Sequence, residues 1–116
     1  MIYAIVDIET TGGYAAAGSI TEIAIFVHDG HRIIDQYHSL VKPLQPIPLF
    51  IQTMTGITNE MVADAPVFEA VAAEVYDLLN DKVFVAHSVN FDFSFLNHAL
   101  QLCGYQLNVK NYVPSG

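Results

Sequence analysis

Short apolar runs separated by turn residues fill the first 42 residues and predict three strands. Residues 2–6 form a run of β-forming side chains, which predicts a strand that is buried on both faces and stops at Asp7. Residues 20–27 and 32–42 predict the second and third strands, and the Asp29-Gly30 pair between them is a strong hairpin signal. We therefore expect the chain to begin with an antiparallel three-stranded meander.

Turn and helix signals follow the third strand. Three prolines within residues 43–48 end the strand and mark a loop. Residues 49–55 favour a short helical turn that Gly56 stops. Thr58 suits the N-cap of another turn over residues 59–62.

The second half of the chain alternates long helices with one short strand. Apolar positions at helical spacing predict a helix over residues 66–80, with Pro66 in its first turn. Residues 83–86 predict a strand, and residues 89–103 a second long helix with Gly104 at its C-terminal cap. Residues 105–116 have no strong pattern. The order β-β-β-α-β-α predicts one α/β domain: a mixed sheet, with the meander at one side, flanked by helices.

Composition narrows the class of protein. A chain of 116 residues with 53% hydrophobic residues fits one folded domain and excludes intrinsic disorder. The net charge is −8, and the four scattered basic residues exclude nucleic-acid binding through a basic patch. The single cysteine, Cys103, excludes a disulfide framework, and its apolar neighbours predict a packing thiol. No apolar run or leader pattern indicates a membrane partner or secretion, so we expect a cytoplasmic location.

The first candidate for chemistry is a pair of acids, Asp7 and Glu9. Carboxylates two residues apart on a strand lie on one face, roughly 7 Å apart. Like charges so placed repel each other, and a bound divalent cation removes that penalty. The alternative is a solvated strand end. The flexible backbone and small hydroxyls of residues 10–13 favour a ligand site instead.

The second candidate is Asp92, near the start of the second long helix. An acid there stabilises a helix by about 0.3–1 kcal/mol through the helix dipole, which is the alternative explanation. The flanking Phe91, Phe93 and Phe95 indicate a mostly buried segment. A partly buried carboxylate needs a cation or several donors.

Together these segments resemble a known family. The sequence Asp7-Ile-Glu9-Thr-Thr-Gly12 resembles the first motif of the DEDD superfamily of 3′–5′ exonucleases, and residues 87–96 resemble the second. Residues 51–58 and 64–68, with Glu74, are similar to segments of the DNA polymerase III epsilon-subunit (DnaQ-like) group. The resemblance extends from residue 2 to about residue 104.

The resemblance implies a ribonuclease-H-like fold and two Mg²⁺ or Mn²⁺ ions. By matching positions, Asp7 would bridge the ions, Glu9 would assist and Asp92 would hold the second ion. The ions would supply the positive charge that the side chains lack. Residues implied at the substrate are Thr10, Thr11, Gly12, Ile57 (or a neighbour in 54–58) as a wedge against the terminal bases, His87, Asn90 and Phe91.

One part of the family pattern is missing. The third motif would supply a fourth acid and a histidine base, yet residues 93–116 contain no Asp or Glu. His98 lies six positions after Asp92, roughly 240° around the helix, so it points away from Asp92 and is interpreted as a surface or groove residue. We treat the other histidines, at positions 28, 31 and 38, as exposed. We expect residues 1–116 to be a single exonuclease domain that is incomplete at its C-terminal end. The alternative is a degenerate domain that binds without cleaving.

The function implied by the resemblance is a metal-dependent 3′–5′ exonuclease acting on single-stranded or frayed DNA ends, in proofreading and beside a DNA polymerase subunit. An RNA-trimming enzyme of the same superfamily and an inert module that binds nucleic acid or a partner are the alternatives. Because a ligand and the base are absent, we expect the 116 residues alone to bind metal weakly and turn over poorly.

Overall fold

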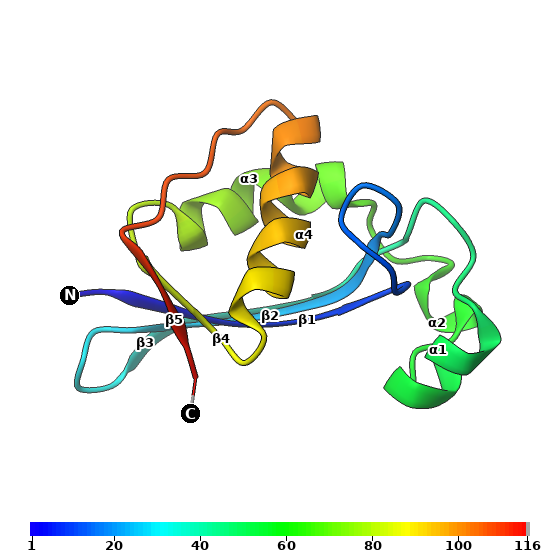
Figure 1. The fold of residues 1–116 in the computed structure, drawn as a ribbon, viewed down its shortest axis with the longest axis horizontal. Coiled ribbons are helices and arrows are strands. Elements are labelled where there is room, and N and C mark those ends of the chain that lie inside the picture. The colour runs from blue at the N-terminus through cyan, green and yellow to red at the C-terminus, as the bar shows by residue number, and fades with distance from the viewer. Residues whose placement is uncertain (116) are drawn as a thin grey trace.

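The first strand of the chain is the centre of a five-stranded sheet with the order β3-β2-β1-β4-β5 (Figure 1). The computed structural model describes residues 1–115. β1 (Tyr3–Thr10) pairs antiparallel with β2 (Ile20–His28), which pairs antiparallel with β3 (Ile33–Leu40). β4 (Val83–Ala86) is parallel to β1, and β5 (Asn111–Pro114) is parallel to β4. The predicted meander and mixed sheet are confirmed.

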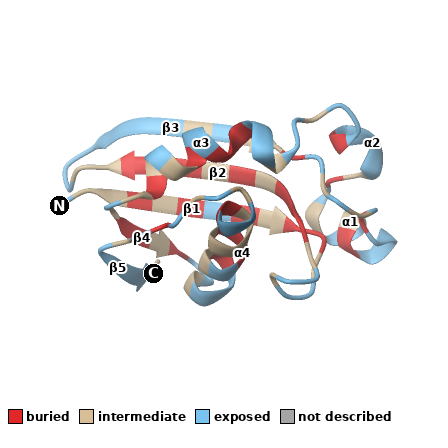
Figure 2. Ribbon diagram, turned by 90° about the horizontal axis from the view of Figure 1, so that it is seen from above, coloured by how far each residue is buried: buried red, intermediate tan, exposed pale blue. Residues whose placement is uncertain are grey.

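Two helices, α3 (Phe68–Leu79) and α4 (Val89–Leu102), cover one face of this sheet (Figure 1). Side chains alternate along β1, so that Ala4, Val6 and Ile8 are buried on the helix-covered face. Figure 2 shows buried residues along the inner strands and mostly exposed residues on the edge strands β3 and β5. The fully buried core side chains include Ile23, Ile25, Val75, Leu79, Phe84, Leu96 and Leu100.

Two short helices, α1 (Leu49–Thr55) and α2 (Asn59–Val62), form a lobe beyond the end of β1 (Figure 1). Gly56 ends α1 in the left-handed region, at φ 78°, which a side chain would disfavour. The Thr58 hydroxyl caps α2 by accepting from the Met61 N–H at 3.2 Å. The lobe has its own small core of Ile47, Ile51, Ile57 and Val62.

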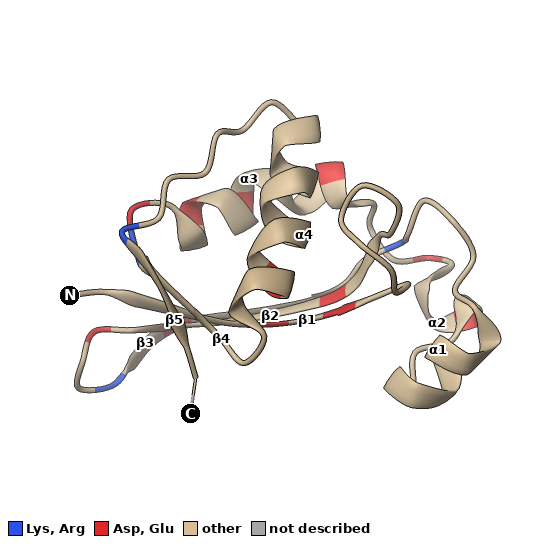
Figure 3. Cartoon of the chain, in the orientation of Figure 1, with Lys and Arg blue, Asp and Glu red and all other residues tan. Residues whose placement is uncertain are grey.

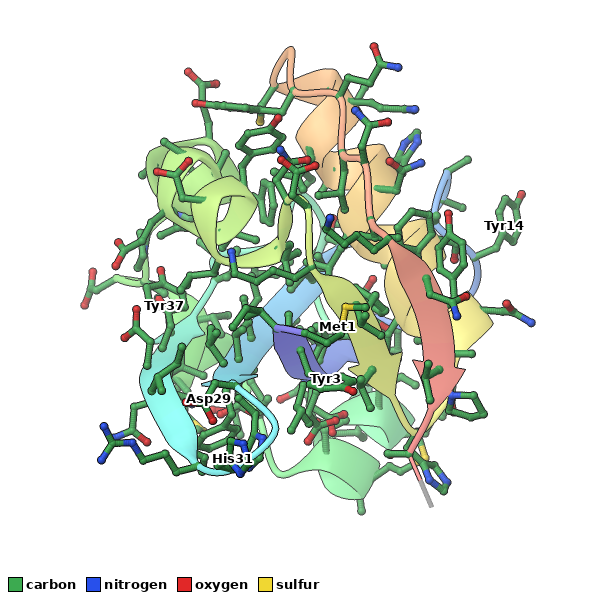
Figure 4. The ribbon with its side chains drawn as sticks, turned by 90° about the vertical axis from the view of Figure 1, so that its left-hand side faces the viewer. Met1, Tyr3, Tyr14, Asp29, His31 and Tyr37 are labelled. Atoms are coloured by element: carbon green, nitrogen blue, oxygen red, sulfur yellow. The ribbon has the colours of Figure 1, made fainter. Side chains whose placement is uncertain are left out.

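The β2–β3 hairpin is fixed by one side chain at its turn. Asp29 Oδ1 accepts from the N–H groups of His31 and Arg32, at 2.8 and 2.9 Å. Figure 4 shows Asp29 and His31 together at this turn. The hydrogen bonds from Arg32 and His31 favour the carboxylate and lower the pKa of Asp29. The hairpin predicted from Asp29-Gly30 is therefore confirmed.

The end of α4 follows the predicted cap. Gly104 has φ +87°, and its N–H donates to the Gln101 carbonyl at 3.0 Å. The Tyr105 N–H donates to the Leu100 carbonyl at 2.9 Å, which completes the paired hydrogen bonds of a Schellman motif. The chain then turns back toward the sheet.

Two strands differ from the prediction. β1 does not stop at Asp7, because β2 continues to pair with it through Asp7 and Glu9 as far as Thr10. It is also not buried on both faces, since Tyr3 and Ile5, which alternate with the buried Ala4 and Val6, are only half-buried. β5 lies where no pattern was found. Its place is fixed by backbone pairing with β4 and by the edge contact of Tyr112 with Phe93, whose ring centroids are 4.7 Å apart.

Cys103 packs against the main core, and burial raises the pKa of its thiol, so its predicted packing role is confirmed. Within residues 1–115, no helix has the length and apolar character needed to cross a membrane.

Candidate active site

The acids of β1 lie just past the end of a neighbouring strand. The last β1–β4 pair is Val6 with Ala86, so the edge of β1 that faces β4 is unpaired from Asp7 onward. The chain leaves β4 and begins α4 at Val89, beside this free edge. Figure 3 shows the acidic segments of β1 and β2 beside the lower end of α4. The short strand β4 thus brings the start of α4 to Asp7 and Glu9.

Asp92 lies in the first turn of α4 and is only 6% exposed. Burial, followed by the charges of Asp7 and Glu9, raises the pKa of Asp92 to about 6, while His87 acts in the opposite direction. Burial and the charges of Asp7 and Glu22 also raise the pKa of Glu9. The three acids therefore form one electrostatic cluster.

Hydrogen bonds to this cluster are missing from the part of the chain that the structure describes. Within residues 1–115, no hydrogen bond is made by the side chains of Asp7, Glu9 or Asp92. In the same part of the chain, no three metal-ligating side chains converge closely enough to hold an ion as they stand. Carboxylate oxygens are the donors that Mg²⁺ and Mn²⁺ prefer, and unbonded side chains are free to rotate toward a cation. The donor set therefore fits a divalent cation in its chemistry.

A cavity of about 220 Å³ opens beside Glu9. It lies between the end of β1, the following loop, α1 and the first turn of α4. Its lining residues are Ile8, Glu9, Thr10, Gly12, Gly13, Ile51, Met54, Thr55 and Phe91. A charged side chain in a small, mainly apolar cavity is the usual form of a binding site.

A match to a protein-family model identifies the family of this chain. The RNase T exonuclease family model, described as "Exonuclease", matches residues 4–113. The chain belongs to this exonuclease family.

Curated relatives of this exonuclease-family chain are much longer proteins. It is 41% identical over 113 residues to proteins named 3′-5′ exonuclease DinG from Staphylococcus aureus, including strains USA300 and NCTC 8325. The match covers 97% of this chain and 13% of each relative. The chain therefore spans about an eighth of the length of the curated relatives it matches.

Solved structures give the same fold. Exonuclease X, described as in complex with 5′ overhanging duplex DNA, is 28% identical, with a TM-score of 0.73 over 94% of this chain and 57% of that one. Exonuclease I of E. coli, with a dT13 oligonucleotide, has a TM-score of 0.80 at 19% identity, over 90% of this chain and 24% of that one. The predicted ribonuclease-H-like exonuclease fold is confirmed.

The predicted substrate residues of this family member fall into two groups. Thr10, Gly12 and Phe91 line the cavity, whereas Thr11, His87 and Asn90 do not. The Thr10 hydroxyl accepts from the Gly12 N–H at 3.0 Å and the Thr11 hydroxyl from the Ser19 N–H at 3.0 Å. Both hydroxyls hold the loop, so the backbone of Gly12 and Gly13 is what the loop offers to a ligand. His87 and Asn90 are exposed at the start of α4.

Ile57, the residue predicted as a wedge, does not line the cavity. Ile57 is 4% exposed because it packs into the small core of the lobe. Met54, in the same 54–58 segment, is 71% exposed and lines the cavity. Its position at the end of α1 follows from the turn of the helix, which points one face of the segment inward and the other outward.

Sequence reasoning also missed a side-chain contact beside the site. His38 is exposed, as expected, yet its Nε2 lies 2.6 Å from Glu22 Oε2. This pairing depends on the register of β2 with β3, which no local pattern reveals. His98, predicted to be a surface or groove residue, lines a second cavity of about 400 Å³ to which none of the three acids contributes.

Proposed function

We propose that this chain is the 3′–5′ exonuclease domain of its protein and hydrolyses the terminal phosphodiester bond at DNA 3′ ends. The observation that carries the proposal is the cluster of three carboxylates, Asp7, Glu9 and Asp92, without protein donors and beside a cavity. The 41% identical relatives named 3′-5′ exonuclease support this polarity.

Asp7, Glu9 and Asp92 would hold one or two Mg²⁺ or Mn²⁺ ions. When bound, such ions supply Lewis-acid activation of water and neutralise the charge on the reacting phosphate. The basic residues of the chain do not supply that charge, because none of the four lines the cavity beside Glu9. The bound metal ions would thus allow this acidic domain to bind negatively charged DNA.

The remaining lining residues position the terminal nucleotide. Phe91 provides an aromatic ring on which the last base stacks without sequence preference, and Met54 provides an apolar contact beside it. The backbone of Gly12 and Gly13 allows close approach because neither residue has a Cβ. Together they exclude water from one side of the scissile bond and orient it toward the acids.

The family's fourth acid and histidine base have no counterpart in residues 93–116, which contain no Asp or Glu. We propose that other residues of the complete protein supply them, which makes residues 1–116 alone weakly active. The same absence favours the second candidate function, a module that binds nucleic acid without cleaving it.

DNA is the proposed substrate because the 28% identical structure of Exonuclease X is described as a complex with 5′ overhanging duplex DNA. An RNA-trimming activity is the alternative within the superfamily, since the same acids serve both sugars. Proofreading with a DNA polymerase subunit remains a prediction from the resemblance to the epsilon-subunit group.

One assay tests the proposal. The full-length protein is incubated with Mn²⁺ and oligonucleotides of DNA or RNA labelled at the 3′ or the 5′ end. We expect early release of the 3′ label from DNA as a mononucleotide, and a loss of about 10³-fold in Asp7→Asn, equal to about 4 kcal/mol. Asp77→Asn, exposed on α3, is the matched control and keeps its activity.

Three outcomes would contradict the proposal. Release of the 5′ label first overturns the polarity, and preference for RNA overturns the substrate. Binding of the oligonucleotide without any release favours the inert binding module.

A further inference from the structure

The loop between β1 and β2, residues 11–19, is closed by its own hydrogen bonds. At its neck, the Thr11 N–H donates to the Ser19 carbonyl at 2.8 Å and the Ser19 N–H to the Thr11 hydroxyl at 3.0 Å. At its tip, the Ala17 and Gly18 N–H groups donate to the Tyr14 carbonyl at 2.9 and 2.8 Å. Tyr14 itself projects away from the body of the protein (Figure 4).

One side chain from a distant segment clamps this loop. Gln45, in the proline-rich segment after β3, donates through Nε2 to the Ala17 carbonyl at 2.7 Å and to the Thr11 hydroxyl at 3.3 Å. Its Oε1 accepts from the Ser19 hydroxyl at 2.6 Å. The neighbouring Leu44 N–H donates to the same hydroxyl at 3.2 Å. The amide nitrogen and the amide oxygen of Gln45 therefore both form hydrogen bonds with the loop.

The two limbs of the clamped loop lie directly against each other. A Cβ on Gly18 would lie 2.4 Å from the Gly12 carbonyl oxygen and 2.9 Å from Phe95 Cε1, so only glycine fits there. Gly12 in turn lies against Ile51 of α1. The limb that Gln45 holds is thus in direct packing contact with Gly12.

Gly12 and Gly13 form one wall of the cavity beside Glu9, and Phe91 forms another. Phe91 packs on Phe95, with ring centroids 4.8 Å apart, and Phe95 is the ring that Gly18 contacts. The Gly12–Gly13 wall and the Phe91 wall of the cavity therefore both depend on the position of the 11–19 loop.

We propose that Gln45 is a positioning residue for the exonuclease reaction, which fixes the 11–19 loop so that Gly12 and Gly13 hold the terminal nucleotide against the three acids. The inference rests on the proposed function. Gln45 touches neither the cavity nor the acids and acts through the loop. Small misplacements of a bound substrate cost large factors in rate, because the reacting atoms must be aligned.

The experiment uses the full-length protein with two substitutions at one position. Gln45→Met keeps the length of the side chain and removes its hydrogen bonds, whereas Gln45→Glu keeps the acceptor for Ser19 and loses the donors. Asn80→Ala is the matched control, because it removes a comparable hydrogen bond, from the Asn108 N–H at 3.0 Å, at the other end of the sheet. The readouts are kcat and KM on a DNA oligonucleotide, amide hydrogen exchange of residues 12–18, and Tm.

We expect Gln45→Met to lower kcat about tenfold per folded molecule and to speed exchange in residues 12–18. Gln45→Glu should lie between Gln45→Met and the wild type, and Asn80→Ala should keep kcat even where its Tm falls. If Gln45→Met does not fold, kcat of Gln45→Glu is compared with kcat of Asn80→Ala instead. A lower kcat in Gln45→Glu supports the positioning role, and an equal kcat overturns it.

Normal kcat in the Gln45 variants, or a loss of kcat that Asn80→Ala matches at an equal fall in Tm, overturns the positioning role alone. A wild-type protein that releases no nucleotide overturns the proposed function and this inference with it.

Discussion

Glu9 and Glu22 face each other directly across β1 and β2, as partners in the antiparallel ladder. Directly opposed like charges on one sheet face destabilise each other. His38 lies against Glu22 from β3, with 2.6 Å between Nε2 and Oε2. A chain of neighbouring titratable side chains therefore extends from Asp92 on α4 across β1 and β2 to His38 on the edge strand β3.

Glu22→Gln should lower the pKa of Glu9. Burial is the largest cause of the raised pKa of Glu9, followed by the charges of Asp7 and Glu22, so removing one like charge favours the ionised form. The pKa is measured from the carboxyl carbon shift of Glu9 in an NMR titration of the metal-free protein. Glu60→Gln, exposed on α2, is the control. An unchanged Glu9 titration in Glu22→Gln would show that the two side chains do not interact.

Asp92→Asn should stabilise the metal-free protein above pH 6. The pKa of Asp92 is raised to about 6 in the folded protein, so the folded state holds its proton longer than the unfolded state does. Between about pH 4 and 6 the wild type loses stability as the buried carboxyl is forced to ionise. We expect Asn at this position to gain about 1–2 kcal/mol at pH 7.5, less than the full shift implies because water reaches the site.

The measurement for this substitution is urea unfolding at pH 3.5 and at pH 7.5 in EDTA. The gain should be present at pH 7.5 and absent at pH 3.5, where the carboxyl is protonated in both states. Asp77→Asn controls for the loss of one negative charge. A gain of equal size at both pH values would contradict the electrostatic account.

Mn²⁺ should raise the Tm of the wild type, because a ligand that binds the folded state stabilises it. At ten times its Kd the ion contributes about 1.4 kcal/mol. Asp7→Asn and Asp92→Asn should lose most of this gain, Asp77→Asn should keep it, and EDTA should reverse it. Equal stabilisation of all variants would mean that the ion binds elsewhere on this acidic chain.

Ile57→Ala and Met54→Ala should separate stability from binding. Ile57 is buried in the small core of the lobe, so its truncation should cost about 2–4 kcal/mol in the free energy of unfolding. Met54 is exposed, so Met54→Ala should change stability by less than about 0.5 kcal/mol while raising KM for the oligonucleotide. Denaturant unfolding and steady-state kinetics measure the two effects. A raised KM in Ile57→Ala at full stability would restore Ile57 as the wedge.

Local patterns predicted the strands and helices that carry the core. β2, β4, α3 and α4 lie within two residues of their predicted bounds, because their apolar periodicity matches the face that they bury. The far half of β1 was not predicted, since Asp7 and Glu9 interrupt the apolar run and only pairing with β2 extends the strand. β5 is exposed along its length, so no pattern of burial marks it.

The candidate site was predictable where one residue type carries the chemistry. The acids at positions 7, 9 and 92 are chemically distinctive, and their motifs lie in order along the chain. Met54 and Gln45 have no such signature. Their roles follow from the turn of α1 and from the contact of residue 45 with a loop that lies 26 to 34 residues earlier in the chain. Contacts of that range depend on tertiary structure.

The hydrogen bonds on the two edges of β1 determine how easily this strand opens compared with the 11–19 loop. β1 pairs with β2 on one side and with β4 on the other, so most of the strand opens only when the sheet itself unfolds. The 11–19 loop is held instead by a handful of turn and side-chain bonds that open locally. Asp7 and Glu9 pair only with β2, but they follow directly from the part of β1 that is paired on both edges, whereas the loop with Gly12 and Gly13 depends on those few bonds alone. Substitutions that remove the loop's own hydrogen bonds can therefore alter the cavity beside Glu9 while the sheet that carries the acids stays folded.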